Sequence, residues 1–176
     1  MKNKPDTIHS LVALSIGSNK GDSILIIGSA IKMLKQSLSD MRIASLYDTD
    51  PLYVMDQGNF INTAVTGFFK GTPRDLLYYI SYVEAKFGRD RVMERRWGER
   101  LLDIDILLFD NLIFKEHDLV IPHPHMKERR FALEPLLELL PDVIDPESGQ
   151  SFWNICRDLP DQGVRRLPHK SVVLPE

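Results

Sequence analysis

The sequence has few of the residues that indicate an oxidised or membrane-bound protein. It contains a single cysteine, Cys156, which excludes an internal disulfide framework and suits a reducing cytoplasm. No apolar run approaches the roughly 20 residues of a membrane-spanning helix. No long apolar region follows the lysines of the opening MKNKPDTIHS, so we expect neither a membrane anchor nor a secretion signal.

An excess of positive charge and a P-loop are also absent. The 22 basic and 25 acidic residues give a net charge of -3, which does not favour binding to nucleic acid. No GxxxxGK stretch occurs, which excludes the P-loop enzymes. The segment GSNKG (Gly17 to Gly21) resembles a phosphate loop only superficially, and we interpret it as a tight connection between a strand and a helix.

The arginines are concentrated in one part of the chain. Seven of them fall between positions 89 and 130: Arg89, Arg91, Arg95, Arg96, Arg100, Arg129 and Arg130. Guanidinium groups match the geometry of phosphates. Although such runs are usually solvated faces, a local basic patch in a slightly acidic protein favours a small phosphorylated ligand over a nucleic-acid surface.

The hydrophobic pattern predicts the order β-α-β-β-α-β. Strands are expected at 11–16, about 43–48, 60–69 and 101–109, with helices at about 22–38 and 72–87. Thr72 and Pro73 are typical of a helix start. This order predicts an α+β, ferredoxin-like fold in which two helices cover one face of the sheet and the other face is free for ligands.

A C-terminal helical extension is expected to follow this core. The turn IPHPHM precedes a predicted helix at 131–140, and a second helix is predicted at 151–158. We expect residues 160–176 to be irregular. With 176 residues, no repeats and no linker, the chain is predicted to be one domain, 1–176, with its core at about 11–158.

Two carboxylates interrupt the apolar segment LLDIDILLF. Residues two apart in a strand point to the same face, so Asp103 and Asp105 project together. Unpartnered ionised carboxylates in an apolar setting are costly. The pair is therefore either solvated and paired with arginines or, as we favour, a site for Mg²⁺, which prefers oxygen ligands.

The residues around the aspartates indicate the kind of ligand. Arginines beside carboxylate-bound Mg²⁺ favour a polyphosphate. His123 and His125 lack a nearby cysteine or a clear third ligand, so zinc is not favoured, and a histidine donating to a phosphate fits better. Phe60, Trp97 and Phe131 are either core residues, as most aromatics are, or a clamp for a planar heterocycle.

At this point RWGERLLDIDIL resembles the signature of the 6-hydroxymethyl-7,8-dihydropterin pyrophosphokinases of folate biosynthesis. The positions that match it are Arg96, Gly98, Arg100, Asp103 and Asp105. ALSIGSNKGD, the TDPL loop, FINTAV, the E-x-x-x-G-R-x-R segment (Glu84, Gly88, Arg89 and Arg91) and PHPHMKERRFAL resemble further family segments in the same order. The resemblance spans residues 11 to 140.

The resemblance implies Mg²⁺-dependent transfer of a pyrophosphoryl group from ATP to the hydroxymethyl oxygen of the pterin, with release of AMP. It implies two Mg²⁺ ions on Asp103 and Asp105. The catalytic residues implied are Arg89, Arg100, Asp103 and Asp105. The residues implied to bind ATP are Arg89, Arg91, Arg100, His123 and Arg129 at the phosphates, with Glu84 and Ile106 near the nucleoside.

The resemblance also implies a pterin pocket. Its residues would be Thr49, Asp50, Pro51, Leu52, Phe60, Asn62, Trp97 and Phe131. Phe60 and Phe131 would sandwich the ring, Asn62 would read its polar edge, and Trp97 would lie on a loop that closes over it.

The residues alone leave two other hypotheses for the function open. One is a different Mg²⁺-dependent nucleotidyl or phosphoryl transferase on a ferredoxin-like sheet. The other is an RNA-binding module, which the acidic balance argues against. Under the favoured hypothesis, a pyrophosphokinase, we expect a cytoplasmic, monomeric enzyme that binds the pterin and ATP. We expect it to bind neither nucleic acid nor a membrane.

Overall fold

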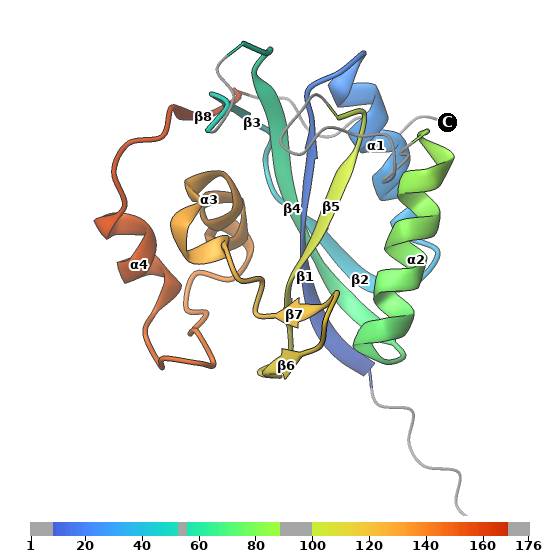
Figure 1. Ribbon diagram of the computed structural model, residues 1–176, viewed down its shortest axis with the longest axis vertical. Helices are drawn as coiled ribbons and strands as arrows, with labels where there is room; N and C mark the ends of the chain where they lie inside the picture. Colours follow the sequence, from blue (N-terminus) through green and yellow to red (C-terminus); the bar gives the residue numbers. More distant parts are fainter. Residues whose placement is uncertain (1–8, 53–55, 89–99, 169–176) are drawn as a thin grey trace, which may run out of the picture.

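The structure is a computed structural model that describes residues 9–52, 56–88 and 100–168 (Figure 1). Its elements in order are β1 (His9–Ser18), α1 (Ser23–Leu34), β2 (Leu38–Ile43), β3 (Tyr47–Thr49), β4 (Phe60–Lys70), α2 (Pro73–Lys86), β5 (Asp103–Phe109), β6 (Phe114–Lys115), β7 (Val120–Ile121), the 3-10 helix η1 (Met126–Glu128), α3 (Arg130–Leu139), α4 (Phe152–Asp158) and β8 (Val164–Arg166). Within this part of the chain, no helix has both the length and the apolar character needed to cross a bilayer.

One antiparallel sheet carries the fold. Its strand order is β5-β1-β4-β3-β8, and β2 pairs with β4 as well. Because β2 and β3 share β4 as their partner, they act together as the second strand of a βαββαβ unit. This arrangement confirms the predicted α+β, ferredoxin-like core.

The helices lie on both faces of the sheet. α1 and α2 lie together on one side, and α3 and α4 lie on the other (Figure 1). The larger apolar core fills the space under α1 and α2, and a second cluster joins α3 and α4 to Ala13, Leu107 and Leu108 of the sheet. The prediction of a free second face is therefore wrong in part, because the apolar side of α3 packs against β4.

Local signals define α2 well. Thr72 and Asp75 form a capping box, in which the Thr72 side chain accepts from the Asp75 N–H and the Asp75 side chain accepts from the Thr72 N–H. Pro73 occupies the first turn, where its missing N–H has no partner to lose. The predicted helix start at this position is confirmed.

The predicted boundaries after the first helix are wrong. α1 ends at Leu34, and Leu38, which continues its apolar spacing, begins β2 instead. Leu38 is buried opposite Phe69 of β4. An apolar residue four positions further on fits a helix or a strand equally well, so pairing with β4 decides between them. The predicted strand at 43–48 likewise straddles the break between β2 and β3.

The prediction that residues 160–176 are irregular does not hold for Val164–Arg166, which form β8, while residues 169–176 lie outside the described residues. β8 pairs with β3 in antiparallel register, with Asp48 opposite Arg165. Two of its three residues are arginines with exposed side chains, so no apolar alternation marks it in the sequence. Main-chain pairing to a sheet edge holds it there.

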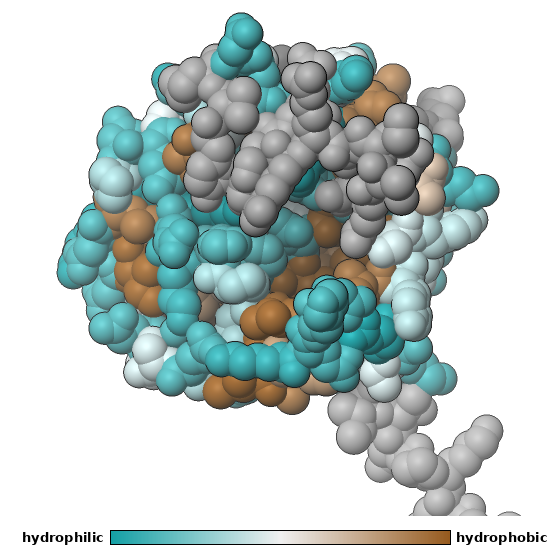
Figure 2. All heavy atoms as spheres, in the orientation of Figure 1, coloured by the Kyte–Doolittle hydropathy of each residue, from teal (hydrophilic) through white to brown (hydrophobic). Residues whose placement is uncertain are grey.

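The surface seen in Figure 2 is hydrophilic over most of its area, with hydrophobic residues gathered in separate patches. The oligomeric state is not decided by this view, and the expected monomer stays a prediction.

Candidate active site

A cavity of about 300 Å³ lies on the sheet face that α3 leaves uncovered. Its walls come from β1, β4 and β5, from the loop after β3, and from the segment around η1. Most of the predicted site residues line it: Thr49, Asp50, Pro51, Leu52, Phe60, Asn62, Arg100, Asp103, Asp105, His123, Arg129 and Phe131. A cavity of this size is typical for a small-molecule ligand.

Asp103 and Asp105 point from β5 into this cavity. They lie opposite Gly17 and Ser15 of β1, which also line it. Their side chains are 23% and 36% exposed, while Ile104 between them packs into the core under α1 and α2. The alternation of the strand therefore separates the carboxylates from the apolar core, as predicted.

Cationic and donor groups surround the two carboxylates. The Arg100 guanidinium forms an ion pair with Asp103. Oδ2 of Asp105 lies 3.7 Å from Nε2 of His123 and 3.9 Å from Nη1 of Arg129. These neighbours offset the mutual repulsion of the two carboxylates and keep positive charge where an anionic ligand would enter.

Arg100 is positioned by the GSNKG turn. Its N–H donates to Oδ1 of Asn19 at 2.7 Å, and its carbonyl accepts from the Asn19 N–H at 3.1 Å. Gly21 adopts a left-handed φ of 71°, and Asp22 caps α1. The turn is thus a strand-to-helix connection, as interpreted from the sequence, and it also holds Arg100 at the cavity.

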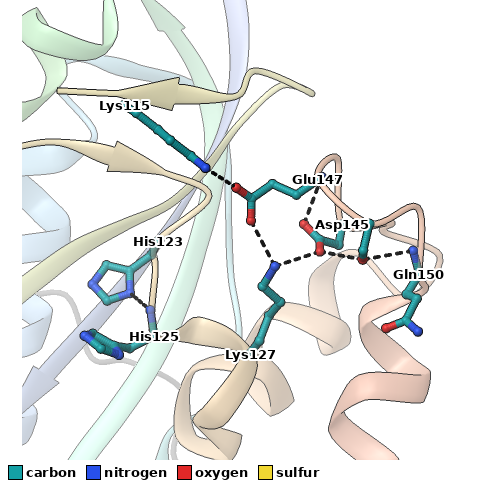
Figure 3. Close-up of polar contacts among 8 residues, drawn as sticks. Lys115, His123, His125, Lys127, Asp145, Glu147 and Gln150 are labelled. Carbon is teal, nitrogen blue, oxygen red and sulfur yellow. Dashed lines mark hydrogen bonds and ion pairs between the residues drawn. The ribbon is translucent and has the colours of Figure 1, made fainter.

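His123 presents a donor to the cavity. Its Nδ1 accepts from the His125 N–H at 3.2 Å (Figure 3), so the neutral ring carries its proton on Nε2, toward Asp105. Burial lowers the pKa of His123 to about 4, the Arg129 and His125 charges add to this effect, and Asp103 opposes it. The neutral ring can donate to an anion without adding a buried charge.

A partly buried ion-pair cluster holds the segment that carries His123 and Arg129. Nζ of Lys127 on η1 lies 2.9 Å from Oδ2 of Asp145 and 3.0 Å from Oε2 of Glu147 (Figure 3). Asp145 is fully buried. Burial raises its pKa, but hydrogen bonds from Ser148 and Lys127 outweigh burial, so the net pKa is lowered.

The opposite part of the cavity suits a flat, polar-edged ligand. Asn62 Nδ2 donates to Thr49 Oγ1 at 2.7 Å, which fixes the orientation of the amide. Asn62 lies opposite Gly17, where an added Cβ would be only 2.5 Å from Asn62 Oδ1. Phe60 and Phe131 line the same cavity, and the Arg129 guanidinium lies 5.6 Å from the Phe131 ring centre.

Two predicted site residues do not line the cavity. Glu84 is 1% exposed, and its Oε1 accepts from the Ile104 N–H at 2.9 Å. Ile106 is buried under α1 and α2. In this structure both residues support β5. Arg89, Arg91 and Trp97 lie outside the described residues.

The sequence interpretation missed four lining residues. Ser15, Gly17, Gln57 and His125 belong to the cavity wall without having been assigned to it. The two β1 residues could have been found once β1 was placed beside β5, because they alternate on the same face as the aspartates. Gln57 lies on an irregular segment and carries no comparable signal, whereas His125 was noted beside His123 but only as a zinc ligand that was not favoured.

The donor set is compatible with Mg²⁺. Among the residues that the structure describes, no group of three or more His, Cys, Asp or Glu side chains could hold a metal ion. Mg²⁺ requires less from the protein, since one or two carboxylates suffice when water and substrate phosphates supply the other ligands. Asp103 and Asp105 beside a cationic wall meet that requirement.

Fold and cavity together define a class: a ferredoxin-like α+β domain whose cavity combines paired carboxylates with arginine and histidine. The profile of one family, 7,8-dihydro-6-hydroxymethylpterin-pyrophosphokinase (HPPK), matches residues 13–141. The chain belongs to this family.

Relatives and solved structures agree with this membership. The chain is 36% identical to the Bacillus subtilis 2-amino-4-hydroxy-6-hydroxymethyldihydropteridine pyrophosphokinase, over 77% of this chain and 81% of that protein. It is 34% identical to the Schizosaccharomyces pombe folic acid synthesis protein fol1, over 90% of this chain but 22% of that protein. A Plasmodium falciparum HPPK-DHPS structure shares the fold, with a TM-score of 0.68 at 14% identity over 88% of this chain and 44% of that one.

Proposed function

We propose that this protein transfers the pyrophosphoryl group of ATP to the hydroxymethyl oxygen of 6-hydroxymethyl-7,8-dihydropterin, releasing AMP, in folate biosynthesis. Family membership supports the reaction. The observation that carries the assignment of the site is that Asp103 and Asp105 share one cavity with Arg100, Asn62 and Phe131. The proposed binding sites for the polyphosphate and for the heterocycle would thereby be adjacent.

Asp103 and Asp105 would hold two Mg²⁺ ions together with the nucleotide phosphates. When bound, the ions would reduce the repulsion between the triphosphate and the approaching alcohol oxygen. The carboxylates contribute oxygen ligands on one face of a rigid strand, which limits how far either can move.

The arginines and His123 would orient the triphosphate. Arg100 and Arg129 offer guanidinium forks, and His123 offers a neutral Nε2–H donor. Arg89 and Arg91 are proposed to add phosphate contacts, Glu84 and Ile106 to lie near the nucleoside, and Trp97 to close the pterin pocket, on the family resemblance alone. Because a primary alcohol is a weak nucleophile, alignment and charge neutralisation must supply most of the acceleration.

The pterin is proposed to bind between Phe60 and Phe131. Both aromatic side chains line the cavity, and Asn62 is held by Thr49 so that its free amide atoms can face the polar edge of the ring. Asp50, Pro51 and Leu52 form the wall beside it. The orientation of Asn62 would give specificity, since a buried amide left unpaired disfavours ligands without matching groups.

We also propose a single-domain, monomeric, cytoplasmic enzyme that requires neither nucleic acid nor membrane. The single cysteine supports a reducing compartment, and the negative net charge argues against nucleic acid as a partner.

The test is a coupled assay of AMP release with purified protein, ATP and Mg²⁺. The proposal expects AMP formation that depends on hydroxymethyl-dihydropterin and stops when the metal is chelated. AMP formed equally well without the pterin, or no AMP with it, would contradict the proposal. Thermal-shift measurements distinguish this proposal from the RNA-binding alternative. The proposal expects a higher Tm with an ATP analogue plus pterin, and the alternative expects a higher Tm with RNA.

A further inference from the structure

The chain beyond the family-matched residues returns to the strand that leads into one wall of the cavity. The match ends at residue 141, yet β8 at Val164–Arg166 pairs with β3, the strand that leads directly into the loop at 50–52 (Figure 1). The Leu167 N–H also donates to the Leu46 carbonyl at 2.8 Å. A segment remote in sequence thus lies beside the wall proposed to hold the pterin.

Arg165 forms a bidentate ion pair with Asp50 in this wall. Its Nη1 lies 2.9 Å from Oδ1 of Asp50, and its Nη2 lies 3.1 Å from Oδ2. Asp50 itself lines the cavity, between Thr49 and Pro51. A guanidinium fork on a carboxylate fixes orientation as well as distance, which a lysine at the same place could not do. The Arg165 hydrogen bonds lower the pKa of Asp50.

Gly163 permits the close approach of the two segments. Its carbonyl accepts from the Asp50 N–H at 3.4 Å. It has a left-handed φ of 64°, and an added Cβ would lie 2.1 Å from Oδ2 of Asp50. A side chain at this position would therefore push the Asp50 carboxylate away.

The same segment is tied to the opposite wall. Gln162 accepts from the Arg130 N–H at 2.9 Å and donates to the Glu128 carbonyl at 2.8 Å, on both sides of Arg129. Arg166 bonds to Ser45 Oγ at 2.9 Å and lies 3.3 Å from Glu138 Oε1 on α3. Residues 162–166 therefore bridge the loop at 50–52 and the start of α3, which carries Phe131.

We propose that residues 162–166 are a positioning element for the heterocycle end of the cavity, and that Arg165 is its main positioning residue. The segment sets the spacing between the Asp50 wall and the Phe131 wall, and thereby the affinity for the pterin. This inference rests on the proposed function. Arg165 and Asp50 are 59% and 43% exposed, and exposed ion pairs add little to global stability, so the pair acts on local position.

The first test compares Arg165→Ala with Arg157→Ala. Arg157 is also exposed and ion-paired, but it lies on α4 and does not line the cavity. Arg165→Ala should raise KM for the pterin about tenfold, a smaller effect than misplacement of reacting groups gives. KM for ATP, kcat and Tm should stay near wild type. Arg165→Lys should recover less than half of the loss in pterin affinity, because it restores the charge without the fork.

The second test uses a matched pair of glycines. Gly163→Ala and Gly149→Ala replace glycines with similar φ values, 64° and 73°. The added Cβ at position 163 would collide with Asp50, whereas nothing lies within 4 Å of an added Cβ at position 149. Both variants carry the same kind of backbone strain. Only Gly163→Ala should weaken pterin binding, measured calorimetrically with a non-hydrolysable ATP analogue and Mg²⁺.

The outcomes separate the two proposals. An inactive wild-type protein overturns the proposed function. An active wild type whose Arg165→Ala and Gly163→Ala variants keep the pterin KM and Kd overturns the positioning role. Equal losses in the Arg157 or Gly149 controls, or a lowered Tm that accounts for the lost activity, overturn it as well.

Discussion

Nε2 of His123 lies 3.7 Å from Oδ2 of Asp105, while Nδ1 of the same ring accepts a hydrogen bond from the His125 backbone. The backbone bond fixes the tautomer, so a neutral donor faces the carboxylate. Asp105 thus has a donor beside it without a permanent positive charge at that ring, while the Arg129 guanidinium lies 3.9 Å from the same oxygen.

Asp105→Asn tests the metal-binding assignment. The amide keeps the size of the side chain but loses the charge that Mg²⁺ requires, so AMP release should fall by about 100-fold or more. Tm should be unchanged, because the side chain faces the cavity. Asp142→Asn on an exposed turn is the control. A well-folded Asp105→Asn variant with near wild-type activity would refute the metal role.

His123→Ala tests the neutral donor. Removing a hydrogen bond to a charged phosphate should lower kcat/KM for ATP by about 10-fold to 100-fold. His123→Gln should retain more activity than His123→Ala, because its amide can place an N–H near the position of Nε2. Steady-state kinetics at varied ATP concentration measure this effect. An equal loss of kcat/KM in both variants would count against a donor role.

Asp145→Asn tests the anchor of η1. Its lowered pKa means that the folded state favours the charged carboxylate, so its stabilisation is present above the unfolded pKa of about 4 and is lost as the pH falls through the lower folded value. At pH 7 the variant should lose about 1.5 to 3 kcal/mol of unfolding free energy.

Urea denaturation at pH 7, 5 and 3 measures this effect. The difference between wild type and Asp145→Asn should shrink as the pH falls below about 4. Asp142→Asn should show no such dependence. A difference that stays constant down to pH 3 would mean that the ionised form is not what stabilises the segment.

Gly17→Ala tests the support of Asn62. A Cβ would lie 2.5 Å from Asn62 Oδ1 and displace the amide from Thr49. The pterin KM should rise about tenfold while KM for ATP changes little. Gly58→Ala is the matched control, because nothing lies within 4 Å of its added Cβ. An unchanged pterin KM would show that Asn62 does not need its present position.

Features that depend on a few adjacent residues could be predicted well. The capping box at Thr72 and Asp75 needs only local backbone geometry, and Asp103 and Asp105 share a face because a strand has a period of two. Prolines and glycines marked enough of the turns and helix ends to predict the order of the core elements. The family segments then indicated most of the residues that line the cavity.

Features that depend on partners remote in sequence could not be predicted in the same way. Leu38 belongs to β2 because Phe69 lies opposite it, and Arg165 matters because β3 brings Asp50 within reach. Gly17 is needed because Asn62 lies beside it on β4.

The sequence by itself therefore determined the fold class, the paired carboxylates and the family. Only the tertiary structure decided where the helices end, which residues complete the cavity and what the C-terminal segment contacts. The physical reason is that caps and strand alternation act within a few residues, whereas strand pairing and side-chain contacts join residues whose separation along the chain leaves no periodic trace.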